Sequence, residues 1–228
     1  MKGVILAGGK GTRLYPLTHA TNKHLLPIYD QPMVFYPIQT LVKAGIDEVL
    51  VVTGGPHAGL KHLEYAYQEG EGGIPAALAL AEDFAAGQAI TVILGDNTTD
   101  AAIGPVVKRF KSGATIFLKK VPDPERYGVP VFDKNDPKKI IKVEEKPKKP
   151  KSDYASTGLY IFDNNCFDYI RTCKPSARGE LEIPDVQNQY IKAGNLRWEL
   201  LKGFWTDAGK FETLYLANKY WAEKALKK

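Results

Sequence analysis

Short apolar runs alternate with stretches of helical periodicity through the first half of the chain. Runs rich in Val, Ile and Leu predict buried strands at residues 4–6, 48–53 and 91–94. Helical patterns lie between them, around residues 34–44 and 74–85. An alternation of strand, helix and strand is typical of a parallel sheet that carries helices on both faces.

The second half of the chain is richer in strands. Apolar runs predict further strands at residues 114–121, 129–133, 140–145 and 158–162, and a final helix near residues 211–226. The turn at residues 133–137 indicates antiparallel strands that extend the same sheet. We therefore predict an α/β fold, a Rossmann-like three-layer α/β/α arrangement with a mixed sheet and extra antiparallel strands. No internal repeat or flexible linker divides the sequence, so we expect a single domain over residues 1–228.

The composition is that of an ordinary globular protein, with 44% hydrophobic and 25% charged residues. Its apolar runs are far shorter than the roughly 18 residues of a membrane span, and its first residues lack the apolar core of a signal peptide. We therefore expect a cytoplasmic protein with no membrane association. The net charge of +5 is modest, and no aromatic pattern is interleaved with the lysines at residues 138–151, so nucleic-acid binding is not expected.

A glycine-rich loop follows the first predicted strand, in the sequence Leu-Ala-Gly-Gly-Lys-Gly-Thr-Arg-Leu at residues 6–14. Its three glycines let backbone N–H groups converge on an anion, and Arg13 adds donors suited to phosphate oxygens. The spacing matches neither a dinucleotide-binding fingerprint, which needs glycine in place of Leu14, nor a Walker loop, which needs Ser or Thr in place of Gly11. A glycine-rich turn without a ligand is the alternative.

Three charged residues are candidates for the same site. Asp96 follows an apolar strand, where a carboxylate can hold Mg²⁺ together with substrate phosphates, or can be a solvated turn residue. Asp207 could be a second metal ligand or the N-cap of the helix that begins near Lys210. Lys23 comes soon after the glycine loop and could reach the same phosphates, although most single lysines are surface residues.

Two further segments could contact the rest of a nucleotide and its partner substrate. Gln68 can read a pyrimidine edge, and Gly73 permits a close approach to it, unless this stretch is a flexible loop. Strand alternation places Glu145 and Lys146 on opposite faces, unless the strand bulges there. The histidines have no metal-ligand spacing, and no catalytic triad order is evident, so hydrolysis through a nucleophile is not expected.

Taken together, these segments resemble the glucose-1-phosphate thymidylyltransferases, within the wider sugar-nucleotide nucleotidyltransferase family. The resemblance covers nearly the whole chain and implies the nucleotide-diphospho-sugar transferase type of fold. The matching blocks occur in the order residues 6–14, 23–30, 94–97, 123–129, 144–147, 154–160 and 174–183. Several blocks in the right order are a far more specific signal than any one of them alone.

The resemblance implies a role for each matching residue. The catalytic residues would be Arg13 and Lys23, and Mg²⁺ would be held by Asp96 and Asp207. The nucleotide would be bound by Leu6, Gly8, Gly9, Gly11, Thr12, Arg13, Gln68, Gly73 and Asp96. The sugar phosphate would be bound by Asn97, Tyr127, Gly128, Glu145, Lys146, Thr157 and Arg178.

The implied reaction transfers a nucleotidyl group from dTTP to glucose 1-phosphate, giving dTDP-glucose and pyrophosphate, in a homo-oligomer (a dimer or a tetramer). The chain departs from its relatives in a shorter connection between Gly54 and Glu64 and in Pro75-Ala76, which replaces Ala-Gln. A UTP-dependent uridylyltransferase is therefore an alternative, and a non-catalytic nucleotide-sugar sensor is an alternative of another class. Longer relatives continue past the final helix into a regulatory extension, so we expect no feedback site of that kind.

Overall fold

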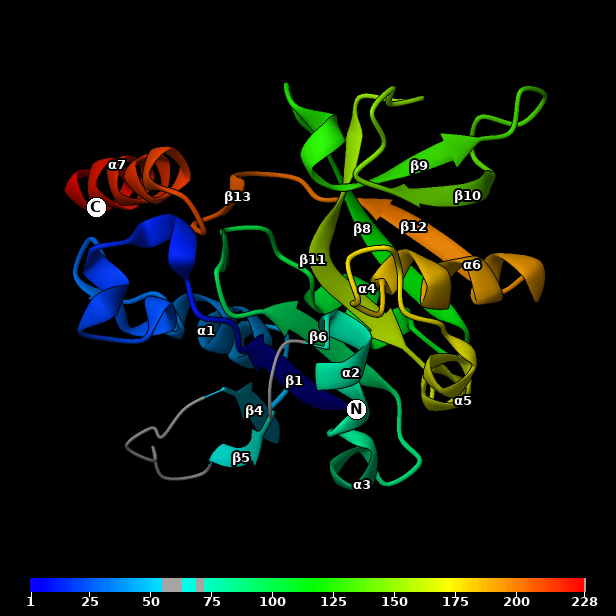
Figure 1. Cartoon of the computed structure of the whole chain (residues 1–228), viewed down its shortest axis with the longest axis horizontal. Coiled ribbons are helices and arrows are strands. Elements are labelled where there is room, and N and C mark those ends of the chain that lie inside the picture. Colours follow the sequence, from blue (N-terminus) through cyan, green and yellow to red (C-terminus); the bar gives the residue numbers. More distant parts are fainter. Residues whose placement is uncertain (55–62, 69–71, 228) are drawn as a thin grey trace.

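A mixed β-sheet forms the centre of the fold, which Figure 1 shows as a computed structural model. The structure describes residues 1–54, 63–68 and 72–227. Within this part of the chain the sheet has nine strands, β1 (Lys2–Ala7), β4 (Val49–Thr53), β5 (Leu63–Tyr67), β6 (Ile90–Leu94), β8 (Ala114–Lys120), β9 (Gly128–Phe132), β10 (Ile140–Glu145), β11 (Tyr154–Phe162) and β12 (Leu196–Leu200). Two short ribbons accompany it, β2 (Pro27–Ile28) with β3 (Gln31–Pro32), and β7 (Asn97–Thr99) with β13 (Trp205–Asp207).

The strand order places the ends of three parallel strands together. The main path runs β10-β9-β11-β6-β1-β4-β5, with β8 beside β11 and β12 beside β8. Strand β1 pairs in parallel with both β4 and β6, and β11 joins antiparallel to β6. Leu6 lies opposite Leu94, and Ala7 lies opposite Thr53. The loops that follow β1 and β6 therefore leave the same edge of the sheet.

The helices are mostly short. They are α1 (Phe35–Lys43), α2 (Ile74–Ala79), α3 (Glu82–Ala85), α4 (Gly104–Arg109), α5 (Asn165–Thr172), α6 (Ile183–Lys192) and α7 (Phe211–Leu226), with 3-10 turns η1 (Thr12–Leu14), η2 (Leu17–His19), η3 (Lys23–Leu25) and η4 (Pro124–Arg126). The helices predicted near residues 34–44 and 211–226 are confirmed. The helix predicted over residues 74–85 is divided, because the N–H of Ala81 donates to the carbonyl of Leu78 and tightens the chain into a turn.

Alternating side chains of β1 pack into two separate layers. Val4 and Leu6 contribute to a core that also contains residues of α2, α5 and α6. Ile5 and Ala7 contribute to another core on the opposite face, with residues of α1 and with Ile103 before α4. Since successive side chains of a strand point to opposite faces, both faces of the sheet are covered by helices. The predicted three-layer arrangement is confirmed.

A third, smaller core attaches α7 to the segment that follows β1. Leu14, Ile28 and Met33 are fully buried there and pack with Leu214 and Ala217 of α7. Figure 1 shows α7, in red, beside this blue segment. The C-terminal helix therefore supports the loops that carry the glycine motif, although the two lie at opposite ends of the sequence.

We expect Phe162→Ala to destabilise the protein by about 3–5 kcal/mol, because it leaves a cavity in the main core. Phe162 is fully buried, and its ring lies 5.7 Å from those of Tyr160 and Tyr190. The matched control Tyr215→Ala removes a ring that is 65% exposed and should change stability by less than about 0.5 kcal/mol. Urea unfolding measures both, and equal losses would contradict this packing.

Candidate functional site

The glycine loop lies at the carboxyl end of β1, between β4 and β6. Gly9 and Gly11 have φ angles of 91° and 66°, which favour glycine over any residue with a side chain. A Cβ at Gly8 would lie 3.0 Å from Gln68 Oε1, and one at Gly11 would lie 3.0 Å from Lys23 Cβ. The loop is therefore in close contact with both of these predicted binding residues.

A cavity of about 390 Å³, here called the glycine-loop cavity, opens at this place. Every residue predicted to bind the nucleotide lines it, namely Leu6, Gly8, Gly9, Gly11, Thr12, Arg13, Gln68, Gly73 and Asp96. Lys23 and Asp207 line it as well. The structure thus gathers residues from five separate stretches of the sequence around one space. Gly70, a further glycine between Gln68 and Gly73, lies outside the described residues.

A second cavity of about 620 Å³, here called the β9–β11 cavity, adjoins the first. Six of the seven residues predicted to bind the sugar phosphate line it, namely Asn97, Tyr127, Gly128, Glu145, Lys146 and Arg178. Arg13, Asp96 and Asp207 line both cavities. These three residues therefore mark the place where ligands in the two cavities would meet.

The structure does not place Thr157 in the β9–β11 cavity, which corrects that prediction. Thr157 is fully buried, and its hydroxyl donates to the carbonyl of Phe117 at 2.9 Å. Its neighbours Ser156 and Gly158 line the cavity instead. Because successive residues of a strand point to opposite faces of the sheet, the side chain of Thr157 lies on the face that is turned away from the cavity.

Asp96 and Asp207 converge from distant parts of the sequence. Asp96 lies between β6 and β7, and Asp207 ends β13, which pairs with β7 so that Asp207 faces Asn97. A Cβ at Gly209 would lie 3.3 Å from Asp96 Oδ2 and 3.9 Å from Asp207 Oδ2. Asp207 is not the helix N-cap, because Lys210 occupies that position. The two carboxylates therefore share one small space above a glycine.

Each carboxylate has its own cation. Lys23 Nζ lies 2.7 Å from Asp96 Oδ2, and both side chains are less than one fifth exposed. Burial raises the pKa of Asp96, but the charges of Lys23 and His24 outweigh it and hold that pKa well below its usual range. On the other side, Arg126 Nη2 lies 3.5 Å from Asp207 Oδ2. Cations of this chain thus reduce the repulsion between the two acids.

Asp207 nevertheless binds its proton more tightly than an ordinary aspartate. Burial and the negative charge of Asp96 raise the pKa of Asp207, while Arg126 and Tyr127 act against the rise. The Tyr127 hydroxyl donates to Asp207 Oδ1 at 3.0 Å. Burial and the charge of Asp207 raise the pKa of Tyr127, so the phenol stays protonated and remains a donor.

Glu145 and Lys146 both reach the β9–β11 cavity, so the expectation of opposite faces is wrong. Strand β10 ends at Glu145, and Lys146 has a φ angle of 40°. This left-handed residue, rather than a bulge, turns the lysine back toward its neighbour, with Nζ 3.2 Å from Glu145 Oε1. Arg178 donates to Glu182 at 2.7 Å and to Glu145 at 3.3 Å. The cations of the cavity are therefore held by carboxylates beside it.

Among the residues that line the β9–β11 cavity and were not predicted from the sequence are Arg126, Ser156 and Gln187. Arg126 lies within the block at residues 123–129, and its Nη1 donates to Asp123 at 2.5 Å. Nothing in that block distinguishes this arginine from a surface residue. Gln187 is in the middle of α6, where no motif surrounds it. Only the packing of α6 against the sheet brings it to the cavity.

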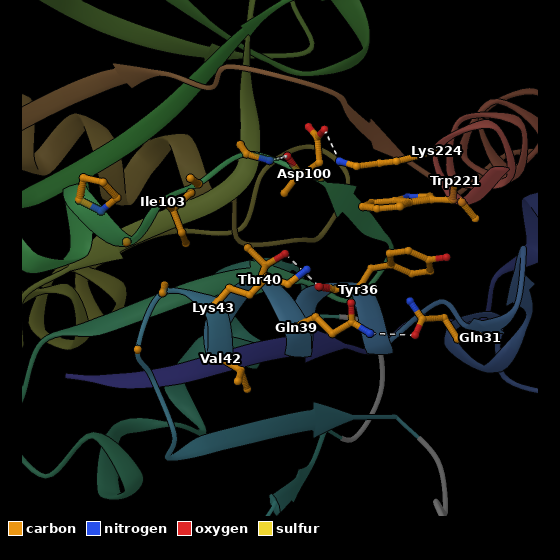
Figure 2. A pocket seen from close by; sticks show the side chains of 18 of the residues that line it. Gln31, Tyr36, Gln39, Thr40, Val42, Lys43, Asp100, Ile103, Trp221 and Lys224 are labelled. Carbon is orange, nitrogen blue, oxygen red and sulfur yellow. Dashed lines mark hydrogen bonds and ion pairs between the residues drawn. The ribbon is translucent and has the colours of Figure 1, made fainter. Parts of the chain in front are cut away.

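A larger cavity of about 770 Å³ lies elsewhere, between α1, the segment 99–105 and α7. Figure 2 shows Lys224 paired with Asp100, at 2.6 Å, and Gln39 donating to Gln31, at 2.8 Å. None of the predicted site residues lines this cavity. Size alone therefore does not identify the functional site, and we assign it to the two cavities that share Asp96 and Asp207.

Two features of the described residues concern metal binding and membrane insertion. In the described part of the chain, no group of three or more His, Cys, Asp or Glu side chains is placed to hold a metal ion. A pair of carboxylates still suits Mg²⁺, which takes its other ligands from phosphates and water. Among the same residues, no helix combines the length and apolar character needed to cross a membrane.

Comparison with known proteins shows the family of this chain. The family described as nucleotidyl transferase matches residues 2–224. A glucose-1-phosphate thymidylyltransferase from Neisseria gonorrhoeae is 42% identical, over 96% of this chain and 82% of the relative. One from Mycolicibacterium smegmatis is 41% identical with the same coverage. The chain belongs to the nucleotidyl transferase family.

Solved structures of nucleotidyltransferases share the fold. A Bacillus anthracis protein assigned as a glucose-1-phosphate thymidylyltransferase, in complex with sucrose, superposes with a TM-score of 0.90 at 46% identity and covers 96% of this chain and 94% of its own. A UDP-glucose pyrophosphorylase complexed with UDP-glucose gives a TM-score of 0.87 at 22% identity, with 98% of each chain covered. At that identity the second likeness shows the fold alone. The predicted nucleotide-diphospho-sugar transferase fold is confirmed.

We expect Lys23→Met to destabilise the metal-free nucleotidyltransferase by about 3 kcal/mol at pH 7, because it leaves Asp96 buried without its cation. The pKa of Asp96 is lowered on folding, so the pair stabilises the fold above the unfolded pKa of about 4 and loses this effect as the pH falls through the lower folded value. The difference between the two proteins should therefore shrink below about pH 4. Urea unfolding in EDTA at several pH values measures it.

The matched control for this prediction is Lys2→Met. Lys2 lies 3.0 Å from Glu48, whose side chain is 63% exposed, so its loss should cost less than about 1 kcal/mol. A Lys23→Met protein as stable as the Lys2→Met protein at pH 7 would contradict the importance of the buried pair.

Proposed function

We propose that this nucleotidyltransferase transfers a thymidylyl group from dTTP to glucose 1-phosphate, giving dTDP-glucose and pyrophosphate. The observation that carries the proposal is the meeting of two cavities at Arg13, Asp96 and Asp207. One cavity has the glycine loop of a phosphate-binding site, and the other is lined by the residues predicted to bind a sugar phosphate. The names of the relatives at 41–42% identity support the same substrates.

The glycine-loop cavity would take the nucleotide. Backbone N–H groups of residues 8–11 would bind phosphate oxygens, since no Cβ prevents their approach. Gln68 and Gly73 lie on the same cavity and would contact the base. Glucose 1-phosphate would lie in the β9–β11 cavity, with its phosphate toward Arg13 and its ring toward Gly128 and α6.

The reaction would proceed by in-line attack. A phosphate oxygen of glucose 1-phosphate forms a bond to the α-phosphorus of dTTP, the bond from that phosphorus to the bridging oxygen breaks, and pyrophosphate leaves with the electron pair. The attacking oxygen is already an anion, so no general base is required. Two charges about 4 Å apart repel by about 4 kcal/mol at an effective dielectric of 20. Arg13, Lys23 and Lys146 would offset this repulsion and stabilise the transferred group.

Mg²⁺ fits the pair of carboxylates. The Oδ2 atoms of Asp96 and Asp207 converge on Gly209, where a side chain would fill the space. Two carboxylates, completed by phosphate oxygens and water, are a typical Mg²⁺ site. When bound there, Mg²⁺ would neutralise phosphate charge and polarise the reacting phosphoryl group. The cytoplasmic location and the homo-oligomeric state stay predictions.

The direct test is pyrophosphate release from a panel of nucleoside triphosphates and hexose 1-phosphates. We expect release that requires Mg²⁺ and both substrates, stops on addition of EDTA, and is fastest with dTTP and glucose 1-phosphate. A higher rate with UTP would favour the uridylyltransferase. Tight binding of nucleotide sugar without any turnover would favour the sensor.

We expect Arg13→Ala to lower kcat by roughly 10²–10³, because it removes one of the charged donors at the junction of the cavities. The fold should persist, since η1 is held through the buried Leu14 rather than through Arg13. Arg171→Ala, which removes an exposed arginine of α5, is the control and should keep full activity. Near-normal turnover of Arg13→Ala would remove Arg13 from the mechanism.

A further inference from the structure

Strands β9 and β11 and helix α6 meet at the β9–β11 cavity. A Cβ at Gly128 would lie 3.4 Å from Pro184 Cγ and 3.6 Å from Ser156 Cβ. Arg126, Lys146 and Arg178 also line the cavity, each within 3.5 Å of a carboxylate. A sugar phosphate whose phosphate lies toward Arg13 would have its ring beside Gly128, Ser156 and α6.

Gln187 lies beside Ser156 in this cavity, and its side-chain oxygen lacks a hydrogen-bond partner. Its side chain is fully buried in α6, and it lines the cavity. Its Nε2 donates to Ser156 Oγ over a long 3.4 Å. Among the described residues, Gln187 Oε1 is the buried side-chain atom that has no hydrogen-bond partner. A buried polar atom left unsatisfied is destabilising and rare in folded proteins.

A different amide orientation does not remove this deficit. Rotation of the amide by half a turn exchanges Oε1 and Nε2, so Oε1 would meet Ser156 and Nε2 would lose its partner instead. The Ser156 hydroxyl can donate or accept, and it is 8% exposed on the cavity. One polar atom of Gln187 therefore lacks a partner in either orientation. Because Gln187 lines the cavity, water or a bound ligand there can supply the partner.

The hydrogen-bonding capacity of the Gln187 amide indicates which ligand groups can bind it. A hydroxyl group can donate to the amide oxygen or accept from the amide nitrogen, so it can satisfy Gln187 in either orientation. A fully ionised phosphate can only accept, whereas each hydroxyl of a hexose can do both. We propose that Gln187, with Ser156 beside it, binds a hydroxyl group of the sugar and makes the enzyme selective for sugar phosphates that carry this hydroxyl. The proposal rests on the proposed function, in which the β9–β11 cavity holds the sugar.

Deoxy sugars test the proposal. The initial rate of pyrophosphate release is measured for wild type and Gln187→Leu with glucose 1-phosphate and with its 2-, 3-, 4- and 6-deoxy analogues. For wild type, kcat/KM should fall about tenfold or more at one deoxy position, because the hydroxyl that satisfies Gln187 is missing. For Gln187→Leu, kcat/KM with glucose 1-phosphate should fall by a similar factor, and the discrimination at that position should fall to about twofold or less. KM for dTTP should not change.

Thermal unfolding of the ligand-free protein gives a second readout. Leucine has a similar volume and removes the unsatisfied amide, so Gln187→Leu should keep or raise the unfolding midpoint, by up to about 2–4 °C. The same substitution at Gln189, two residues along α6, is the control. Gln189 is bonded to the exposed Thr172 and does not line the cavity, so Gln189→Leu should change neither kcat/KM nor the discrimination.

Ser156→Ala removes the hydroxyl that is paired with Gln187. It should weaken discrimination at the same deoxy position as Gln187→Leu, and it keeps the test decisive if the leucine variant folds poorly. A Gln187→Leu protein that is less stable yet keeps the wild-type deoxy pattern would overturn the proposal and assign Gln187 to a structural role. Discrimination lost equally at every position would also overturn it.

Failure of the proposed function gives a different result. A wild-type protein inactive with every hexose 1-phosphate would contradict both the function and this inference. A wild-type protein that is active and discriminates among the deoxy sugars, with an unchanged pattern in both variants, would contradict the inference alone.

Discussion

The mutual repulsion of Asp96 and Asp207 is the constraint on which the site depends. The two acids approach the same glycine from β6 and β13, where burial and like charge disfavour ionisation and nearby positive charge favours it. Lys23 and Arg126 supply it, one on each side. Burial raises the pKa of both acids, but Lys23 at 2.7 Å outweighs it at Asp96, whereas Arg126 at 3.5 Å does not outweigh it at Asp207. A divalent cation bound between the two carboxylates would reduce their repulsion further and would carry the charge of the phosphates as well.

The fold delivers this pair through pairings that are distant in sequence. Strands β1 and β6 end at one edge and place the glycine loop beside Asp96. The ribbon of β7 with β13 then carries Asp207 to the same place, and α7 packs behind it on the small third core. Because Arg13, Asp96 and Asp207 line both cavities, each substrate would meet the same charges from its own side. The geometry therefore brings the two reacting phosphates together while it opposes their repulsion.

The layers and the central strands could be predicted from the sequence because they depend on local hydrophobic patterns. The residues of the glycine-loop cavity were implied by the resemblance to a known family. Sequence analysis could not predict features set by tertiary packing. The direction of Thr157 depends on which face of β11 meets the cavity, and that of Lys146 depends on a single left-handed residue. The turn at residues 80 and 81, and the role of Gln187 in α6, have no signal in the sequence at all. Local sequence patterns indicate the chemistry of the loops. The proposed selection of the sugar depends on Gln187, which reaches the cavity only through the packing of α6.

The most direct test of the central claim is a titration with Mn²⁺, a paramagnetic substitute for Mg²⁺, followed by electron paramagnetic resonance. It is made in the presence of α,β-methylene-dTTP, whose P–C bond cannot be cleaved, on wild type, Asp96→Asn and Asp207→Asn. If the two carboxylates share one cation, wild type binds Mn²⁺ tightly, and either substitution weakens binding by at least about tenfold, since removing a charged ligand from a metal site typically costs more than a second-shell change. Binding of unchanged affinity in either variant would contradict the account.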